Sequence, residues 1–264
     1  MKTFIRAVLG AIAVMTTPVH AQSTDPYLWL EDVDGEKAMQ FVRAENQRTL
    51  DALSGTQRFQ AIQTEVRAVL DSRERIPAVV ERGPWLYNLW QDAANPRGLW
   101  RRTTWEEFRK PTPAWEIVLD IDALAKSENE NWVWAGTTCL PPQYQRCLIE
   151  FSRGGGDATV VREFDTTKKS FVSDGFTLPE AKSSVTWRDI DTIYVGTDFG
   201  PGSMTTSGYP RLVKRWQRGT PLAAASQVYA GESTDVSVNA WVDPTPGHFR
   251  EGVYRGIEFF KGSM

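Results

Sequence analysis

Apolar residues recur at helical spacing in the first part of the chain. A first stripe begins at Ala38 and continues to Leu53. A second stripe consists of Phe59, Ile62, Val66 and Val69. Intervals of three and four residues predict two amphipathic helices within residues 34–73, separated at Ser54-Gly55. Two short helices cannot bury both stripes on each other, so we expect them to need a further surface.

The pattern changes from Ile76 onward, where short β-rich runs alternate with turns of Gly, Pro, Asp and Asn. The expected strands are residues 78–82, 85–91, 99–104, 115–120, 132–138, 147–152, 159–165, 169–172, 185–188, 192–197, 211–217, 226–230, 236–242 and 257–260. Many short strands with turn signals between them are typical of an all-β sandwich, barrel or propeller.

A weak internal repeat favours the propeller. Strand groups begin near Ile76, Trp132, Val185 and Val236, at intervals of roughly fifty residues, which is about the length of a four-stranded blade. The chain would then contain three fuller blades and the start of a fourth. An incomplete ring leaves edge strands and sheet faces uncovered.

The N-terminus has the features of a secretory signal peptide. Lys2 and Arg6 flank a mostly apolar run over residues 4–15, and a small-x-small site at residues 19–21 precedes Gln22. The alternatives are a membrane anchor or a buried helix, but the run is shorter than the roughly 20 residues that span a bilayer. We therefore expect residues 1–21 to be removed on export, and the mature protein not to be embedded in a membrane.

Composition narrows the range of partners. The formal net charge is −3, and no basic patch is interleaved with aromatic residues, which disfavours nucleic acid. The chain has 11 Trp, and large stiff indoles suit the faces of packed sheets. A sugar-binding aromatic platform would need a clustering of these residues that sequence alone does not show.

The chain has two cysteines, Cys139 and Cys147, at the base of an expected hairpin. An exported protein meets an oxidising compartment, so we predict a disulfide between them. Closing this short loop would contribute about 2–3 kcal/mol. The alternative is two free thiols. Two thiols alone make a poor zinc site, because zinc takes four ligands or three and a water.

The residues of a serine hydrolase are not found together in this sequence. A nucleophile elbow has the pattern Gly-x-Ser-x-Gly, and no such pattern occurs. Ser203 lacks the second glycine, and Ser207 has Thr205 and Tyr209 at the flanking positions. Signal removal would take away His20 and leave one histidine, which excludes a His-based metal site.

The other polar candidates are expected to be structural. His248 lies in a Pro/Gly-rich loop, where a solvated role is more common than a catalytic one. Three acidic pairs are expected in turns, and a glycine-rich run is expected in a hairpin loop rather than a phosphate cradle. These are Asp120 with Asp122, Glu106 with Glu107, Asp189 with Asp191, and residues 152–157. We assign no catalytic, cofactor-binding or metal-binding residue, and we expect no cofactor.

Several segments resemble the prolyl oligopeptidase family of serine peptidases. Residues 25–32 (DPYLWLED) and 44–49 (AENQRT) are similar to the opening of that family. Four further segments are similar to the propeller of that family: residues 147–155, 161–165, 175–182 and 207–211. The resemblance covers residues 24 to about 260 and is greatest to bacterial exported members. None of these segments supplies triad or oxyanion residues.

The resemblance implies a mainly β fold. Family members have an N-terminal helical segment, a seven-bladed β-propeller and an α/β-hydrolase domain that holds the Ser-Asp-His triad. This chain would comprise a signal peptide (1–21), an N-terminal two-helix segment (22–75) and about three and a half blades, or half a propeller (76–264). The hydrolase domain, on which the helices would pack, would be missing.

The resemblance also implies a function. The chain would be the non-catalytic front part of a serine endopeptidase that acts on short peptides, with the propeller gating access. It would be inactive alone, with peptide substrates and the C-terminal hydrolase domain as partners of the whole enzyme. We expect a bacterial exported protein, periplasmic or secreted. The alternative is a secreted β-propeller binding module, which the two helices disfavour because they need a partner domain.

Overall fold

The computed structural model describes residues 25–32 and 34–264, so the predicted signal peptide lies outside the described residues. The chain divides into two compact units, with the boundary between Arg67 and Ala68. The first unit opens with a short 3-10 helix, η1 (Leu28–Glu31). Its Trp29 packs edge-on against Phe41, with ring centroids 5.5 Å apart, and thereby attaches the opening motif to the first long helix.

Two α-helices follow, as predicted. They are α1 (Glu36–Leu53) and α2 (Gln57–Leu70). The break falls at Ser54-Gly55, where the Ser54 amide and hydroxyl both donate to the Leu50 carbonyl and end α1. Much of the apolar stripe of both helices is exposed, including Leu53 at 61% and Val66 at 51%. Both helices therefore expose apolar surface to water, which is energetically unfavourable unless another surface covers it.

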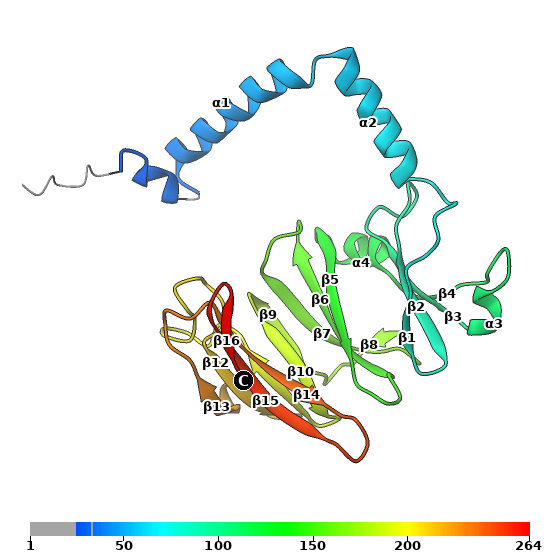
Figure 1. Cartoon of the computed structure of the whole chain (residues 1–264), viewed down its shortest axis with the longest axis vertical. Coiled ribbons are helices and arrows are strands. Elements are labelled where there is room, and N and C mark those ends of the chain that lie inside the picture. The colour runs from blue at the N-terminus through cyan, green and yellow to red at the C-terminus, as the bar shows by residue number, and fades with distance from the viewer. Residues whose placement is uncertain (1–24, 33) are drawn as a thin grey trace, which may run out of the picture. The chain divides into compact units, whose positions relative to one another are not determined.

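The described part of the second unit contains four antiparallel sheets that follow one another in chain order (Figure 1). The first sheet has the strand order β1 (Val80–Arg82), β2 (Trp85–Trp90), β3 (Leu99–Thr103) and β4 (Glu116–Asp120). The second sheet contains β5 (Trp132–Cys139), β6 (Arg146–Arg153), β7 (Thr159–Asp165) and β8 (Ser170–Phe171), with β9 (Thr177–Ala181) also paired to β7.

The third and fourth sheets repeat the same meander. The third sheet contains β10 (Ser184–Asp189), β11 (Thr192–Gly196), β12 (Leu212–Gln217) and β13 (Ser226–Ala230). The fourth contains β14 (Ser237–Asp243), β15 (Arg250–Glu258) and β16 (Lys261–Ser263). The first strand of the third sheet contacts the first strands of the second and fourth sheets. Successive blades of a propeller are arranged in this way. The structure therefore confirms the predicted fold, which is mainly β and consists of a partial propeller that follows two helices in the chain.

Most predicted strands are present, and the differences have local causes. The strand expected at residues 257–260 is wrong, because β15 ends at Glu258 and the exposed Phe259 and Phe260 form the turn to β16. Strand β9 was not predicted, because Pro179 within it is atypical of a strand interior. Three short helices were also missed: α3 (Trp105–Phe108), α4 (Ile121–Glu128) and η2 (Leu222–Ala224).

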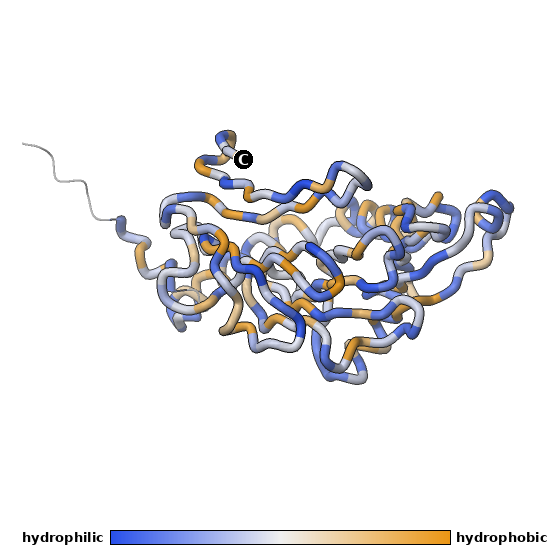
Figure 2. Tube along the Cα trace, turned by 90° about the horizontal axis from the view of Figure 1, so that it is seen from below, coloured by the Kyte–Doolittle hydropathy of each residue, from blue (hydrophilic) through white to orange (hydrophobic). Residues whose placement is uncertain are grey.

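Apolar side chains fill the space between consecutive sheets. Figure 2 shows apolar and polar segments alternating along the strands, as expected when alternate side chains enter a core. Three buried clusters are centred on Trp100 and Phe151 between sheets one and two, on Trp187 and Trp216 between sheets two and three, and on Val238 between sheets three and four. The tryptophans of the propeller thus serve largely as core residues.

Each pair of stacked sheets is also joined by ion pairs. Lys169 of the β7–β8 turn meets Glu116 of β4 at 2.8 Å, and Arg188 of β10 meets Glu251 of β15 at 3.0 Å. The most buried of these pairs joins sheets two and three. The fully buried carboxylate of Glu163 in β7 accepts two hydrogen bonds from Arg218, at 2.8 and 3.1 Å.

Glu163 has further donors. Arg146 approaches its carboxylate at 3.3 Å, and the Phe176 amide donates to it at 2.9 Å. Arg218 also donates to the Ile190 carbonyl and lies over the Phe176 ring at 4.6 Å. The hydrogen-bonding capacity of this buried carboxylate is thus well satisfied, whereas its removal would leave two arginines without their shared partner.

We predict that Glu163→Ala lowers the free energy of unfolding by about 3 kcal/mol, because it breaks a buried ion pair from one side. Urea denaturation followed by circular dichroism measures the change. The matched control is Glu130→Ala, whose partner Arg153 is 40% exposed and which should change stability far less than Glu163→Ala, because solvent screens an exposed ion pair. Equal effects of the two substitutions would contradict the structural role given to Glu163.

Candidate functional site

The serines considered as nucleophiles have structural surroundings. Ser203 lies in the loop between β11 and β12 and is buried. Its hydroxyl donates to the Gly200 carbonyl at 2.6 Å and accepts from the Phe199 amide at 2.9 Å. Ser207 is exposed in a turn of the same loop. A hydroxyl that closes its own loop in this way is not presented to a substrate.

His248 lies in the β14–β15 hairpin loop and is exposed. Its backbone amide donates to the Thr245 carbonyl, which is a turn contact. The structure thus places His248 and Ser203 in different loops and gives neither a hydrogen bond to the other among the described residues. No nucleophile–base pair is formed by these two residues.

The acidic pairs have local structural roles, although two of the three do not lie in turns as expected. Asp120 caps α4 by accepting from the Ala123 amide at 2.9 Å. Asp122, inside α4, accepts from the Arg97 and Gly98 amides and holds the β2–β3 loop. The remaining pairs are Glu106 with Glu107 in α3, and Asp189 with Asp191 at the β10–β11 turn. The glycine-rich run forms the β6–β7 hairpin loop.

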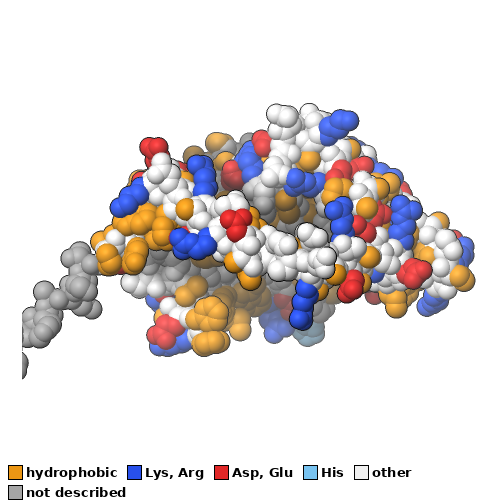
Figure 3. Space-filling view, turned by 90° about the horizontal axis from the view of Figure 1, so that it is seen from above, with side chains coloured by type: hydrophobic (Ala, Val, Ile, Leu, Met, Phe, Trp, Pro, Cys, Tyr) orange, Lys and Arg blue, Asp and Glu red, His pale blue; other side chains and the backbone are white. Residues whose placement is uncertain are grey.

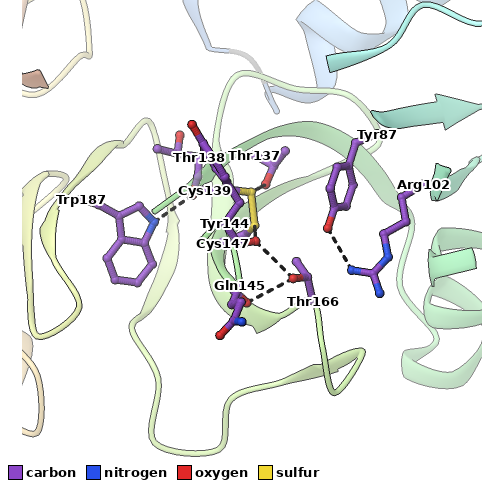
Figure 4. Close-up of a disulfide and its surroundings, with 10 residues drawn as sticks. All are labelled: Tyr87, Arg102, Thr137, Thr138, Cys139, Tyr144, Gln145, Cys147, Thr166 and Trp187. Carbon is purple, nitrogen blue, oxygen red and sulfur yellow. Dashed lines mark hydrogen bonds between the residues drawn. A yellow bond between two sulfur atoms is a disulfide. The ribbon is translucent and has the colours of Figure 1, made fainter. Parts of the chain in front are cut away.

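The structure joins Cys139 and Cys147 by a disulfide (Figure 4). The two cysteines are directly opposite each other on β5 and β6. The surrounding backbone is held by side chains: the Thr166 hydroxyl donates to the Tyr144 carbonyl at 3.2 Å, and the Trp187 indole donates to the Thr138 carbonyl at 2.9 Å. The bridge therefore lies in an ordered hairpin base next to the third sheet. That it forms in the exported protein stays a prediction.

The first sheet borders a cavity of about 670 Å³, which we call the Arg101 cavity. Its volume is within the range of small-ligand pockets. The lining combines aromatic rings, prolines and charged groups from the segment before β1, from β2 and β3, and from the α3–β4 loop. The lining side chains include Arg73, Glu74, Arg75, Trp90, Asp92, Arg101, Lys110 and Trp115.

Arg101 is held between two indoles at this cavity. Its guanidinium lies 4.3 Å from the ring centre of Trp90 and 4.2 Å from that of Trp115. Its Nε donates to the Asn88 side-chain oxygen at 3.0 Å. Burial lowers the pKa of Arg101 to about 10, so the group remains charged at neutral pH.

The carboxylate of Asp92 in the same cavity is already engaged. It accepts from the Trp90 indole at 3.1 Å and from the Asn95 and Ala94 amides. The hydrogen bond from the Trp90 indole is the main reason that the pKa of Asp92 falls to about 2. Asp92 therefore shapes the β2–β3 turn and is ionised at any physiological pH.

Sequence reasoning did not find this cavity. Trp90, Arg101 and Trp115 are far apart in the chain and lie together only because β2, β3 and β4 pair. The alternation Leu99-Trp100-Arg101-Arg102 in β3 is the one local signal, since it places an arginine on each face of a sheet. Among the described residues, no group of three or more His, Cys, Asp or Glu could hold a metal ion.

Comparison with known protein families identifies the family of this chain. A family model described as "Prolyl oligopeptidase, N-terminal beta-propeller domain" matches residues 12–241. The chain belongs to the prolyl oligopeptidase family. The resemblance seen in the sequence is thereby confirmed, and the four stacked sheets are blades of this family's N-terminal propeller.

Named relatives support the same assignment. An uncharacterized peptidase of Sinorhizobium fredii is 40% identical over 288 aligned positions, covering all of this chain and 40% of that protein. An uncharacterized peptidase of Rickettsia prowazekii is 31% identical, covering 80% of this chain and 30% of that protein. The chain thus spans 30–40% of the length of these relatives.

A solved structure agrees. The structure of a post-proline cleaving enzyme from Rickettsia typhi superposes with a TM-score of 0.81 and 29% identity, covering 89% of this chain and 35% of that one. In the part of our chain that the structure describes, no helix has both the length and the apolar character to cross a membrane.

We predict that replacing both cysteines by alanine lowers the free energy of unfolding by about 2 kcal/mol, because the unfolded chain then loses a short cross-link. Thermal melts with and without reductant measure this. The chain exported natively should show no alkylatable thiol in intact-mass analysis until it is reduced. Two reactive thiols in the unreduced exported protein would contradict the prediction.

Proposed function

We propose that this chain is the N-terminal, non-catalytic portion of an exported serine endopeptidase of the prolyl oligopeptidase type. The observation that supports this most strongly is the 40% identity along the whole chain to a peptidase of which it spans 40%. The described residues supply stacked sheets and exposed helices, while the candidate serines and His248 have structural surroundings. The chain would therefore contribute a scaffold, and the chemistry would belong to the rest of a longer protein.

The substrates that we propose are short peptides, cleaved after proline. The relative from Rickettsia typhi is described as a post-proline cleaving enzyme, and at 29% identity it is similar enough to suggest the same preference. In this proposal the propeller limits access by size. Stacked sheets with buried ion pairs, such as Glu163 with Arg218, would make a stiff wall suited to that role.

The exposed stripes of α1 and α2 favour an enzyme over the alternative of a secreted propeller that only binds a ligand. Leu53, Val66 and Val69 are all more than half exposed. Apolar faces of this kind require a partner surface, which a following α/β-hydrolase domain would supply. The reading frame downstream of codon 264 distinguishes these two alternatives. A Gly-x-Ser-x-Gly motif with a following histidine supports the enzyme, and the absence of that motif supports the binding module.

Export is part of the proposal. The cationic, apolar and small-x-small segments of residues 1–21 support secretion to the periplasm or beyond. The pairing of Cys139 with Cys147 is compatible with an oxidising compartment. Fractionation of cells that express the tagged chain, with N-terminal sequencing of the mature form, tests the route. A mature protein that still begins at Met1 in the cytoplasm would contradict it.

We predict that the purified 264-residue chain does not cleave proline-containing chromogenic peptides. Neither Ser203 nor His248 has a catalytic partner, so the rate should equal that of buffer alone. His248→Ala is the informative variant, because it removes an exposed loop residue without disturbing the core. Turnover by the chain that disappears in His248→Ala would show that the assignment of a non-catalytic part is wrong.

The size limit is tested on the longer protein, if the downstream frame encodes the hydrolase. Short proline-containing peptides should be cleaved, whereas the same sequence within a flexible loop of a folded protein should resist. Equal cleavage of both substrates would contradict gating while leaving the peptidase assignment in place.

A further inference from the structure

Arg82 ends β1 at the interface between the first and second sheets. It is paired with Trp85 of β2, so its side chain lies on the same face of the sheet as Tyr87, the face that meets the second sheet. Its guanidinium carbon lies 5.3 Å from the ring centre of Tyr87 and 5.9 Å from that of Trp100. The guanidinium is therefore placed over aromatic rings, while the residue remains partly exposed to solvent.

The guanidinium of Arg82 has no acceptor in the part of the chain that the structure describes. Its side chain forms neither a hydrogen bond nor an ion pair with any of residues 25–32 and 34–264. Burial lowers the pKa of Arg82, and the groups that oppose this change are the phenols of Tyr87 and Tyr144, not a carboxylate. The N–H donors of a permanently charged guanidinium are thus available to a ligand.

Arginines at comparable positions between sheets have carboxylate partners. Arg102, on the same face of the first sheet, donates to Glu116 at 2.7 Å. Between the second and third sheets, Arg218 meets Glu163 at 2.8 Å. A partly desolvated cation without such a partner costs free energy. This contrast favours an anion from outside the described chain as the partner of Arg82.

Tyr144 of the β5–β6 loop provides a second donor, from the hairpin that the disulfide closes (Figure 4). A Cβ atom at Gly83, next to Arg82, would lie 3.8 Å from Cδ2 of Tyr144, so the β1–β2 turn and this loop lie against each other. The Tyr144 amide donates to the Leu140 carbonyl at 2.9 Å, and its carbonyl accepts from the Thr166 hydroxyl at 3.2 Å. The backbone of Tyr144 is thereby held, while its own hydroxyl has no hydrogen-bond partner among the described residues.

The charge and shape of this site favour a carboxylate. One guanidinium without a counter-ion balances one negative charge, since the charge of the nearby Arg102 is already balanced by Glu116. A planar guanidinium binds a carboxylate through two parallel hydrogen bonds, and a phenol O–H can donate a third. The rings of Tyr87, Trp100 and Tyr144 suit an apolar group next to that carboxylate. Two touching loops border the site, which favours a chain end over an internal acidic residue, because a chain end brings polypeptide to one side only.

We propose that Arg82 and Tyr144 form a binding site for the C-terminal carboxylate of a short peptide. The guanidinium of Arg82 donates to both carboxylate oxygens, the Tyr144 hydroxyl donates to one of them, and the last side chain of the peptide packs on the aromatic rings. That this peptide is a substrate or product of the longer enzyme rests on the proposed peptidase function. The binding itself does not, because it is measured on a chain that performs no cleavage.

Titration of the 264-residue chain, followed by NMR at the Nε–H of Arg82 and the backbone amide of Gly83, tests the site. The Nε–H resonance is identified as the one that disappears in Arg82→Lys. The probe is acetyl-Ala-Leu with a free carboxylate, and the comparisons are acetyl-Ala-Leu amide and acetate. The free acid should bind on the order of tenfold more tightly than the amide, as expected for one charge-assisted contact, and also more tightly than acetate, which lacks the apolar side chain.

Two variants separate the contributions to binding. Arg82→Gln should abolish the preference for the free acid over the amide, and Tyr144→Phe, which removes one hydroxyl, should weaken binding of the free acid about threefold. The control is Arg250→Gln, an exposed arginine of β15, which should bind as the unaltered chain does. Since Arg82 has no partner in the described chain, Arg82→Gln should keep its melting temperature without peptide, whereas Arg102→Gln, which breaks the pair with Glu116, should lower it.

Each outcome bears on the proposal. Tighter binding of the free acid that is lost in Arg82→Gln supports it. Equal affinity for acid and amide, unchanged selectivity in the folded variants, or no binding of either peptide would overturn it, and acetate binding as tightly as the peptide would overturn the assignment to peptide ends. If Arg82→Gln does not fold, Arg82→Lys and Tyr144→Phe provide the same comparison. A failure of the peptidase assignment would appear in the downstream reading frame and would leave these binding results unchanged.

Discussion

The buried carboxylate of Glu163 is the contact on which the stacking of this structure depends most. It is fully buried and is shared by Arg146 of its own sheet and Arg218 of the next. The hydrophobic clusters on either side supply most of the attraction between sheets, but apolar contacts are not directional. The ion pair sets the register in which the second and third sheets meet, because its hydrogen bonds form in only one arrangement.

The same design extends along the propeller with decreasing burial. Glu116 with Lys169 and Arg188 with Glu251 join the outer pairs of sheets, at contacts that are partly open to solvent. At the entry to the fourth sheet, Arg255 of β15 donates twice to the buried Asp235 of the β13–β14 loop and lowers the pKa of that carboxyl. Each blade is thus an antiparallel meander whose faces are apolar and whose relative position is fixed by a few charged side chains. Lys, Arg, Asp and Glu side chains are interspersed on the face shown in Figure 3.

Membership of the prolyl oligopeptidase family gives this scaffold its context. The sequence contained candidate catalytic residues, including Ser203 and Asp122. In the structure, these two side chains hold loops in place through hydrogen bonds. The Arg101 cavity, in contrast, brings Arg101 between the Trp90 and Trp115 rings on one face of a blade. In this chain, therefore, the serine and aspartate that could have been catalytic contribute to folding.

The sequence by itself determined the two helices, most of the strands, the blade repeat and the family. These features depend on local periodicity and turn chemistry, which are written in consecutive residues. It also indicated the pairing of Cys139 with Cys147, since a hairpin brings near neighbours together. Local propensity failed where tertiary pairing overrode it, as at Phe259-Phe260 and at β9. Only the tertiary structure decided that Glu163 joins Arg218 and that Arg101 lies between Trp90 and Trp115, because those contacts form when strands distant in the chain pair and sheets stack.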